Sequence, residues 1–305
     1  MLSPHNSFID TESALATIEA MRKQEETGYR SYDYLHQQVP PFPSVNSPQN
    51  AGEPVDVDCR FRMSEWCYQI VDFCKFKRET VAVSMSYLDR FLCTPAGLDI
   101  FLDRSMFQLA AMTALYTAIK IHEPEAMEPT LIASLSRGVY NEEQVEAMEF
   151  KMLNAIMWRV NPPTAIAFIH ELLDLIPSSI ISGDARAAVI DLAKFQTEVA
   201  VSDYAFVTVN TSSIAFAALF NAFESMNMDL KLQSHIEYSL AQAAKIESQS
   251  TQIRDVRIRL YEAITKLPGS GQLCSSLSPE TTCNIDYTKT TSVHGSPRSV
   301  SAATV

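Results

Sequence analysis

Apolar side chains recur every three or four residues over long stretches of this 305-residue chain. Segment 141–158, NEEQVEAMEFKMLNAIMW, shows the pattern most clearly. Its apolar stripe, which follows one face of an α-helix, consists of Val145, Met148, Met152 and Ile156. Asn141 stands before two acids, and Gln144 follows three residues later, the arrangement of an N-terminal capping box. The segment is therefore predicted to be a helix with one face in a core.

Segment 105–121 is apolar almost all the way round. From Ser105 to Ile119 the chain reads SMFQLAAMTALYTAI, without an ionised side chain. A helix that lacks a polar face is normally surrounded by other helices. This segment is therefore expected to be the centre of a helical bundle, and Lys120 and His122 arrive only at its end.

Proline positions extend the helical pattern. None of the fifteen prolines falls in 55–94, 96–123, 130–161 or 178–267, and proline breaks helix interiors. Besides the two segments above, helices are predicted near 57–76, 79–93 and 128–136. After Pro162-Pro163 five more are predicted near 164–176, 186–204, 208–226, 232–246 and 250–267.

The fold class expected from these elements is all-α, with two tandem five-helix domains. The first domain is predicted at 57–161 and the second at 162–267, joined at the Pro-Pro break. Residues 1–56 are expected to form an N-terminal helix, SALATIEAMRKQEE, and a flexible linker. The Ser-, Thr- and Pro-containing tail, 268–305, is expected to be disordered.

Composition narrows the function classes. The net charge is −12, and no run of Lys and Arg supplies a phosphate-binding patch, so nucleic acid is not an expected partner. The N-terminus lacks a signal peptide pattern, and no uncharged apolar stretch reaches the roughly 18 residues of a membrane span. We expect an intracellular protein without a membrane partner.

Motifs of catalysis and cofactor binding are missing from the sequence. It has no GxSxG, HExxH or glycine-rich phosphate loop, and its six cysteines form no CxxC pair. We expect no catalytic residue, no metal and no cofactor. Two charged sites stand out instead. Glu149 lies on the apolar face of 141–158, and Asp89-Arg90 interrupts the apolar YLDRFL, so each of these charges needs a partner.

Three stretches resemble the landmark sequences of a cyclin box, in the same order and at the same spacing. They are RFRMSEWCYQIVDFCKFKRETVAVSMSYLDRFL (60–92), QLAAMTALYTAIKIHE (108–123) and YNEEQVEAMEFKMLNAIMWRVNPPTAIAFI (140–169). The resemblance implies two tandem cyclin boxes, the second divergent. It also implies a non-catalytic subunit of the nucleus and cytoplasm that binds and activates a cyclin-dependent serine/threonine kinase to control cell-cycle progression. The wording of the first box favours the G1/S transition, as in D-like cyclins.

The resemblance assigns roles to residues of the first box. Lys120 and Glu149 match the pair that brackets the kinase, while Ile121, Leu153 and Trp158 match the apolar part of that interface, although each of the three could be ordinary core. Lys120 also has a simpler interpretation. A lysine near a helix C-terminus interacts favourably with the helix dipole, by roughly 0.3 to 1 kcal/mol.

Arg60 and Asp89 match a buried pair that holds the first box together. Arg60, Met63 and Trp66 also match a surface patch that docks kinase substrates or inhibitors in many cyclins. This sequence departs from that patch at Cys59 and Arg62, where apolar residues are usual. The departure puts docking there in question.

Two further hypotheses concern the tail and the function class. Ser278-Pro279 and Ser296-Pro297 are candidate sites for proline-directed kinases. The alternative function is a cyclin-fold transcription factor or adaptor that activates no kinase, and it would need a basic face for nucleic acid or a groove for acidic peptides.

Overall fold

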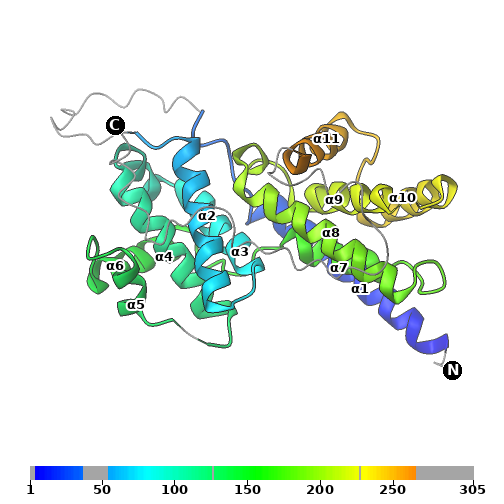
Figure 1. Ribbon diagram of the computed structural model, residues 1–305, viewed down its shortest axis with the longest axis horizontal. Coiled ribbons are helices and arrows are strands. Elements are labelled where there is room, and N and C mark those ends of the chain that lie inside the picture. The colour runs from blue at the N-terminus through cyan, green and yellow to red at the C-terminus, as the bar shows by residue number, and fades with distance from the viewer. Residues whose placement is uncertain (1–3, 37–53, 126, 227, 266–305) are drawn as a thin grey trace.

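The computed structural model describes residues 4–36, 54–125, 127–226 and 228–265. These residues form α-helices and short 3-10 helices, with no strand among them, which confirms the expected all-α class (Figure 1). Ser278, Ser296 and the rest of the tail lie outside the described residues.

The first five-helix bundle follows the predicted segments closely. It consists of α2 (Val57–Cys74), α3 (Glu79–Leu92), α4 (Arg104–His122), α5 (Pro129–Leu135) and α6 (Glu142–Ala155). A 3-10 helix that was not predicted, η1 (Pro95–Leu102), connects α3 to α4. Every residue of 107–119 in α4 is buried, and α4 packs against α2, α3, α5 and α6, as expected for the central helix. Asn141 and Gln144 form the predicted capping box of α6.

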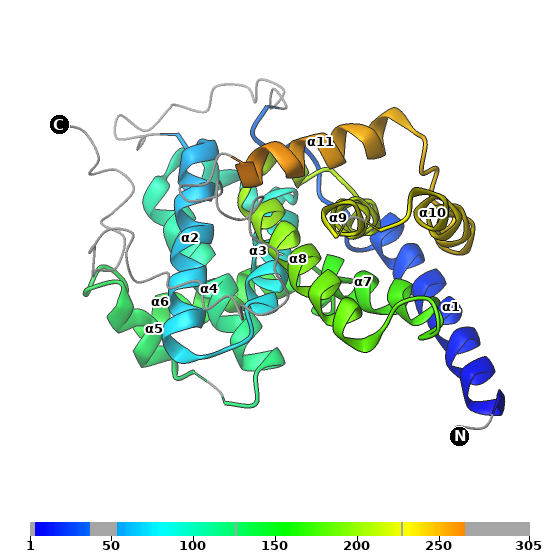
Figure 2. The ribbon, with the colours of Figure 1, turned by 45° about the vertical axis from the view of Figure 1, so that its right-hand side comes forward.

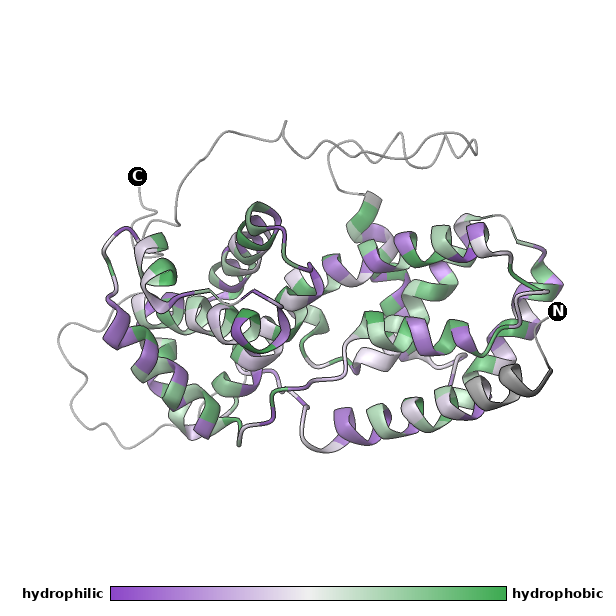
Figure 3. Cartoon of the chain, turned by 90° about the horizontal axis from the view of Figure 1, so that it is seen from below, coloured by the Kyte–Doolittle hydropathy of each residue, from purple (hydrophilic) through white to green (hydrophobic). Residues whose placement is uncertain are grey.

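The second bundle also contains five α-helices. These are α7 (Ala165–Asp174), α8 (Gly183–Ser202), α9 (Thr211–Ser225), α10 (Leu230–Ala244) and α11 (Thr251–Thr265), with a one-turn 3-10 helix η2 (Tyr204–Phe206) before α9. Here α9 is the buried helix, and α7, α8 and α11 pack around it. Hydrophilic and hydrophobic residues alternate along the helices, the appearance of amphipathic helices (Figure 3).

Two separate clusters of buried apolar side chains form the interior. One is built from α2 to α6, together with Tyr34 and Tyr204. The other is built from α7 to α11, together with Ile18. These clusters support a division of the chain near Pro162-Pro163, and the predicted domain boundaries stay a prediction.

Helix α1 (Pro4–Thr27) precedes the first bundle in sequence but packs on the second, against α7 and α10 (Figure 2). Its Glu25, only 4% exposed, reaches the N-terminus of α9. The carboxylate accepts hydrogen bonds from Ser212 N at 2.9 Å, Ser212 Oγ at 2.5 Å and Thr211 Oγ1 at 3.0 Å. The N-cap residue Asn210 makes no side-chain capping bond. Glu25 therefore caps α9 from a distant helix, where negative charge is favourable.

Replacing Glu25 by alanine is expected to lower the free energy of unfolding by about 1 to 3 kcal/mol, because Ser212 N would lose its buried acceptor. Chemical denaturation monitored by circular dichroism measures this loss. Glu26→Ala is the matched control, since Glu26 is on the same helix, is 54% exposed and pairs only with Arg22. Its cost is expected to stay below about 1 kcal/mol. Equal losses in the two variants would contradict the capping role.

Candidate functional site

Lys120 and Glu149 meet at the surface of the first bundle, where the end of α4 crosses α6. Lys120 Nζ donates hydrogen bonds to both carboxylate oxygens of Glu149, at 3.1 and 3.3 Å. Thr117, one turn earlier on α4, donates its hydroxyl to the same carboxylate at 3.2 Å. The side chain of Lys120 is 49% exposed and that of Glu149 only 12%. The charge on the apolar face of α6 therefore has the partner that burial demands.

The local fold explains why the pair forms here. The buried stretch of α4 ends at Ile119, so Lys120 is the first residue after it that can reach solvent. Burial lowers the pKa of Lys120, but the hydrogen bond and the negative charge of Glu149 outweigh it and raise the pKa above its ordinary value. The Tyr116 ring also lies 5.4 Å from the ammonium group. Lys120 thus has a specific partner in addition to any interaction with the helix dipole.

Exposed apolar side chains lie beside this pair. Of the three predicted from the resemblance, Ile121 is 42% and Trp158 is 59% exposed. Leu153 is 7% exposed and belongs to the core beneath them, so its direct contact with a partner stays a prediction. The sequence analysis missed Phe150 at 65% and Met157 at 66% exposure. Phe150 could have been found, because an aromatic residue outside the Val145 stripe of α6 has no core to enter.

We call the surface formed by Lys120, Ile121, Glu149, Phe150, Met157 and Trp158 the α4–α6 face. Met157 and Trp158 both have left-handed backbones, with φ of 55° and 56°, which is costly for residues with bulky side chains. The indole N–H of Trp158 donates to Asn154 Oδ1 at 3.1 Å. This bond fixes the ring while it remains exposed.

Side chains of α3 and α4 hold the chain that follows Trp158 in place. Tyr87 Oη donates to Val160 O at 2.5 Å, and His122 Nε2 lies 2.9 Å from the same carbonyl oxygen. Arg90 Nη2 donates to Arg159 O at 2.9 Å. Since His122 follows Ile121 directly, these bonds hold the end of α4 next to the segment that carries Met157 and Trp158. The left-handed pair is thus supported by buried polar groups rather than by glycine.

The second predicted pair, Arg60 and Asp89, lies inside the molecule at 3% and 5% exposure. Arg60 Nε donates to Asp89 Oδ1 at 2.9 Å and Nη2 to Oδ2 at 2.8 Å, a bidentate pair. Tyr34 Oη donates to Asp89 Oδ1 at 2.7 Å. Arg60 Nη1 donates to Val201 O of the second bundle at 2.8 Å. The pair joins the first bundle to the preceding segment and to the second bundle.

The expected docking patch is mostly beneath the surface. Arg60, Met63 and Trp66 are 3%, 0% and 4% exposed. On the outside of the same helix, Phe61 is 46% exposed, and Arg62 forms an exposed ion pair with Asp58 at 2.8 Å. Docking at this position stays a prediction, and Phe61 and Arg62 supply its accessible side chains.

The described residues also bear on metal sites, disulfides and membrane spans. Within 4–36, 54–125, 127–226 and 228–265, no group of three or more His, Cys, Asp or Glu could hold a metal ion. Cys59, Cys67, Cys74 and Cys93 are free thiols. None of the helices in this part of the chain is both long and apolar enough to span a bilayer.

Comparison with known proteins places this geometry in a family. Residues 17–161 match the family model described as "Cyclin, N-terminal domain". The chain is 26% identical over 220 residues to Cyclin-B1-1 of Oryza sativa subsp. japonica, covering 70% of this chain and 44% of that protein. It is 26% identical over 236 residues to G2/mitotic-specific cyclin-2 of Antirrhinum majus, covering 73% and 48%. The chain thus spans less than half the length of these curated relatives.

A solved structure shows the same fold. The X-ray structure of a viral cyclin from herpesvirus saimiri superposes with a TM-score of 0.55 at 20% identity, covering 69% of this chain and 88% of that chain. The family model matches the segment that carries α2 to α6, and the fold continues in a second bundle of the same class. Sequence, fold and relatives agree: residues 17–161 form a cyclin N-terminal domain, and the chain as a whole is similar to cyclins.

Proposed function

We propose that this cyclin binds a cyclin-dependent serine/threonine kinase through the α4–α6 face and thereby activates it. The observation that carries the proposal is the Lys120–Glu149 pair at 3.1 Å, with exposed Ile121 and Phe150 next to it in sequence and exposed Trp158 just after α6. Apolar anchors beside a charged pair are what a specific protein interface requires. Lys120 and Glu149 are also the two residues that the cyclin-box resemblance assigns to the kinase interface.

In this proposal, binding activates the kinase by changing its conformation. The α4–α6 face offers binding energy, and a kinase that binds it better in the active conformation shifts toward that conformation. In this proposal the cyclin contributes no reacting group, and its targets in the cell are the kinase, the substrates of that kinase and its inhibitors. The nucleus and cytoplasm are the proposed locations.

The cell-cycle phase proposed from the sequence can be compared with the names of the relatives. The G1/S transition follows from the wording of the first box, whereas the relatives carry the names of B-type and G2/mitotic cyclins. Those names lend no support to G1/S. A transcription factor or adaptor that uses the same fold is the second candidate, and the net charge of −12 disfavours a nucleic-acid face.

Affinity purification of the tagged chain from synchronised cells tests the proposal. The expected result is a cyclin-dependent kinase among the captured proteins. The eluate is also expected to phosphorylate a histone substrate. Samples taken at G1/S and in mitosis identify the phase in which the complex forms. Capture of transcription proteins without a kinase in both samples would overturn the proposal in favour of the adaptor.

A further inference from the structure

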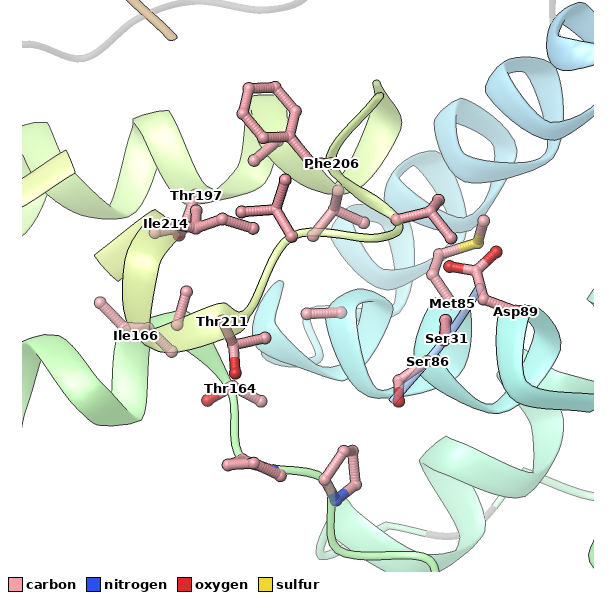
Figure 4. Close-up of a pocket in the computed structure, with 18 of the residues that line it drawn as sticks. Ser31, Met85, Ser86, Asp89, Thr164, Ile166, Thr197, Phe206, Thr211 and Ile214 are labelled. Carbon is pink, nitrogen blue, oxygen red and sulfur yellow. The ribbon is translucent and has the colours of Figure 1, made fainter. Parts of the chain in front are cut away.

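A cavity of about 140 Å³ lies between the two bundles. Ala82, Met85 and Ser86 of α3 form one wall, and the start of α7 (164–166) forms part of the opposite wall. The segment 29–31, which follows α1, also lines it. Figure 4 shows Ser31, Met85, Ser86 and Asp89 at one end, and Thr164, Ile166, Thr197, Thr211 and Ile214 at the other. The cavity is thus lined by three parts of the chain that are distant in sequence, and it is partly open to solvent.

The acidic groups of this wall are already partnered within the protein. Asp89 is paired with Arg60, and Glu198 with Arg78 at 2.8 Å. Glu25 caps α9, and Glu79 accepts a hydrogen bond from the Thr164 hydroxyl. Because these carboxylates are satisfied, a ligand would gain little by carrying a positive charge.

The basic side chains that line the cavity do not favour an anionic ligand. Arg60 and Arg78 are held in the ion pairs just described, Arg30 is exposed, and Lys194 is half-buried. Long basic side chains of this kind keep their charged ends in water while their stems cover apolar surface. Most of the remaining lining is apolar, from residues such as Met85, Ile166 and Phe206, and its polar groups are neutral: the hydroxyls of Ser, Thr and Tyr and the amide of Asn210. This composition suits a neutral and mostly apolar ligand.

Volume limits the size of the ligand. Apolar cavities of about 150 Å³ in other proteins accept a single benzene ring, and drug-sized pockets are at least about twice as large. We infer that the interdomain cavity is a binding site for a small neutral ligand of about one aromatic ring, held between α3, the α7–α9 wall and the segment 29–31. The inference does not depend on kinase binding, since the cavity and the α4–α6 face share no residue.

A ligand in this position has a defined effect on the protein. It contacts both bundles and the segment 29–31 at once, and such contacts exist only when these parts are assembled. Binding to the folded state alone stabilises that state in proportion to ligand concentration. The ligand is therefore expected to raise the melting temperature of the full chain.

Toluene and indole are suitable probes, because one matches the proposed size and the other is larger. Thermal melts and isothermal titration of the full chain with toluene are expected to show saturable binding at one site and a higher melting temperature. Indole is expected to bind about tenfold more weakly, since an overfilled cavity strains its walls. Absence of saturable toluene binding by the wild type would overturn the inference.

Two variants that fill the cavity from opposite walls locate the site. Ala82→Leu extends a side chain from α3, and Ala165→Leu extends one from α7. Both are expected to weaken toluene binding about tenfold or more. Ala188→Leu is the matched control, because Ala188 is exposed on α8 and does not line the cavity. Either filled variant, if folded, suffices for the comparison. Wild-type toluene affinity in a folded filled variant would overturn the location, and the inference with it.

Discussion

Asp89→Ala is expected to lower the free energy of unfolding by about 3 to 5 kcal/mol, because it leaves a buried guanidinium without its counter-charge. Arg60 is 3% exposed and cannot swing into water without opening the interior. Burial lowers the pKa of Arg60, but the charge of Asp89 raises it above its ordinary value, so the residue stays protonated. Tyr34 would also lose the acceptor of its hydroxyl. Thermal and denaturant melts measure the loss.

An exposed ion pair on α2, the helix that carries Arg60, is the control. Asp58→Ala breaks the pair with Arg62, whose members are 61% and 51% exposed, and should cost less than about 1 kcal/mol. The double variant Arg60→Met, Asp89→Leu removes both charges and is expected to be more stable than Asp89→Ala alone. A single variant that melts with the wild type would show that Asp89 is not the buried partner of Arg60.

Charge reversal at the α4–α6 face has the largest expected effect on association. Lys120→Glu or Glu149→Lys would place a repulsive or unpaired charge against a partner surface, a penalty of roughly 2 to 5 kcal/mol in binding. The fold should survive, since Lys120 is half-exposed, but the loss of stability should exceed the less than about 1 kcal/mol of a fully exposed pair, because Glu149 is only 12% exposed. Co-precipitation and activation of the kinase measure the binding loss, and circular dichroism verifies the fold.

The exchanged variant, Lys120→Glu with Glu149→Lys, separates the two roles of the pair. It can rebuild the internal ion pair, so any loss of stability in the single variants should be recovered. Binding should not be recovered if the partner contacts the two charges separately, because each position then still carries the wrong charge. Lys231→Glu, at an exposed lysine of α10, controls for the change in net charge. Folded single variants that bind and activate the kinase normally would refute the assignment of this face.

Local pattern was sufficient to predict most of the helices. The apolar stripe of α6 and the proline-free segments predicted each α-helix of both bundles, because periodicity and helix breakers are encoded within a few residues. The 3-10 helix η1 was missed, since its run PAGLDIFL is too short for a helical period. The position of α1 could not be predicted, because it depends on contacts such as Glu25 with Ser212, 187 residues apart.

The candidate site was predictable only in part. Glu149 on an apolar face indicated a buried charge in need of a partner, but the resemblance to cyclins, rather than the helical pattern, identified Lys120 as that partner. Nothing in the sequence predicted the left-handed backbone at Met157 and Trp158, because glycine or asparagine normally marks that conformation. Here the conformation depends on Tyr87 and other groups that reach the segment from distant helices.

The capping of α9 by Glu25 also orders events during synthesis. Helix α1 leaves the ribosome before both bundles, and Ser212 is made 187 residues after Glu25. At about 5 to 20 residues per second, the delay is about 10 to 40 s. Ile18, 1% exposed in the finished protein, has no partner from α7 until that helix is made late in this interval, and none from α10 until after it. In proteins most of the stability of a helix comes from the packing of its apolar face, which α1 lacks until then. Helix α1 is thus made before both bundles but secured only with the second, and the nascent chain offers chaperones an apolar segment until that bundle is complete.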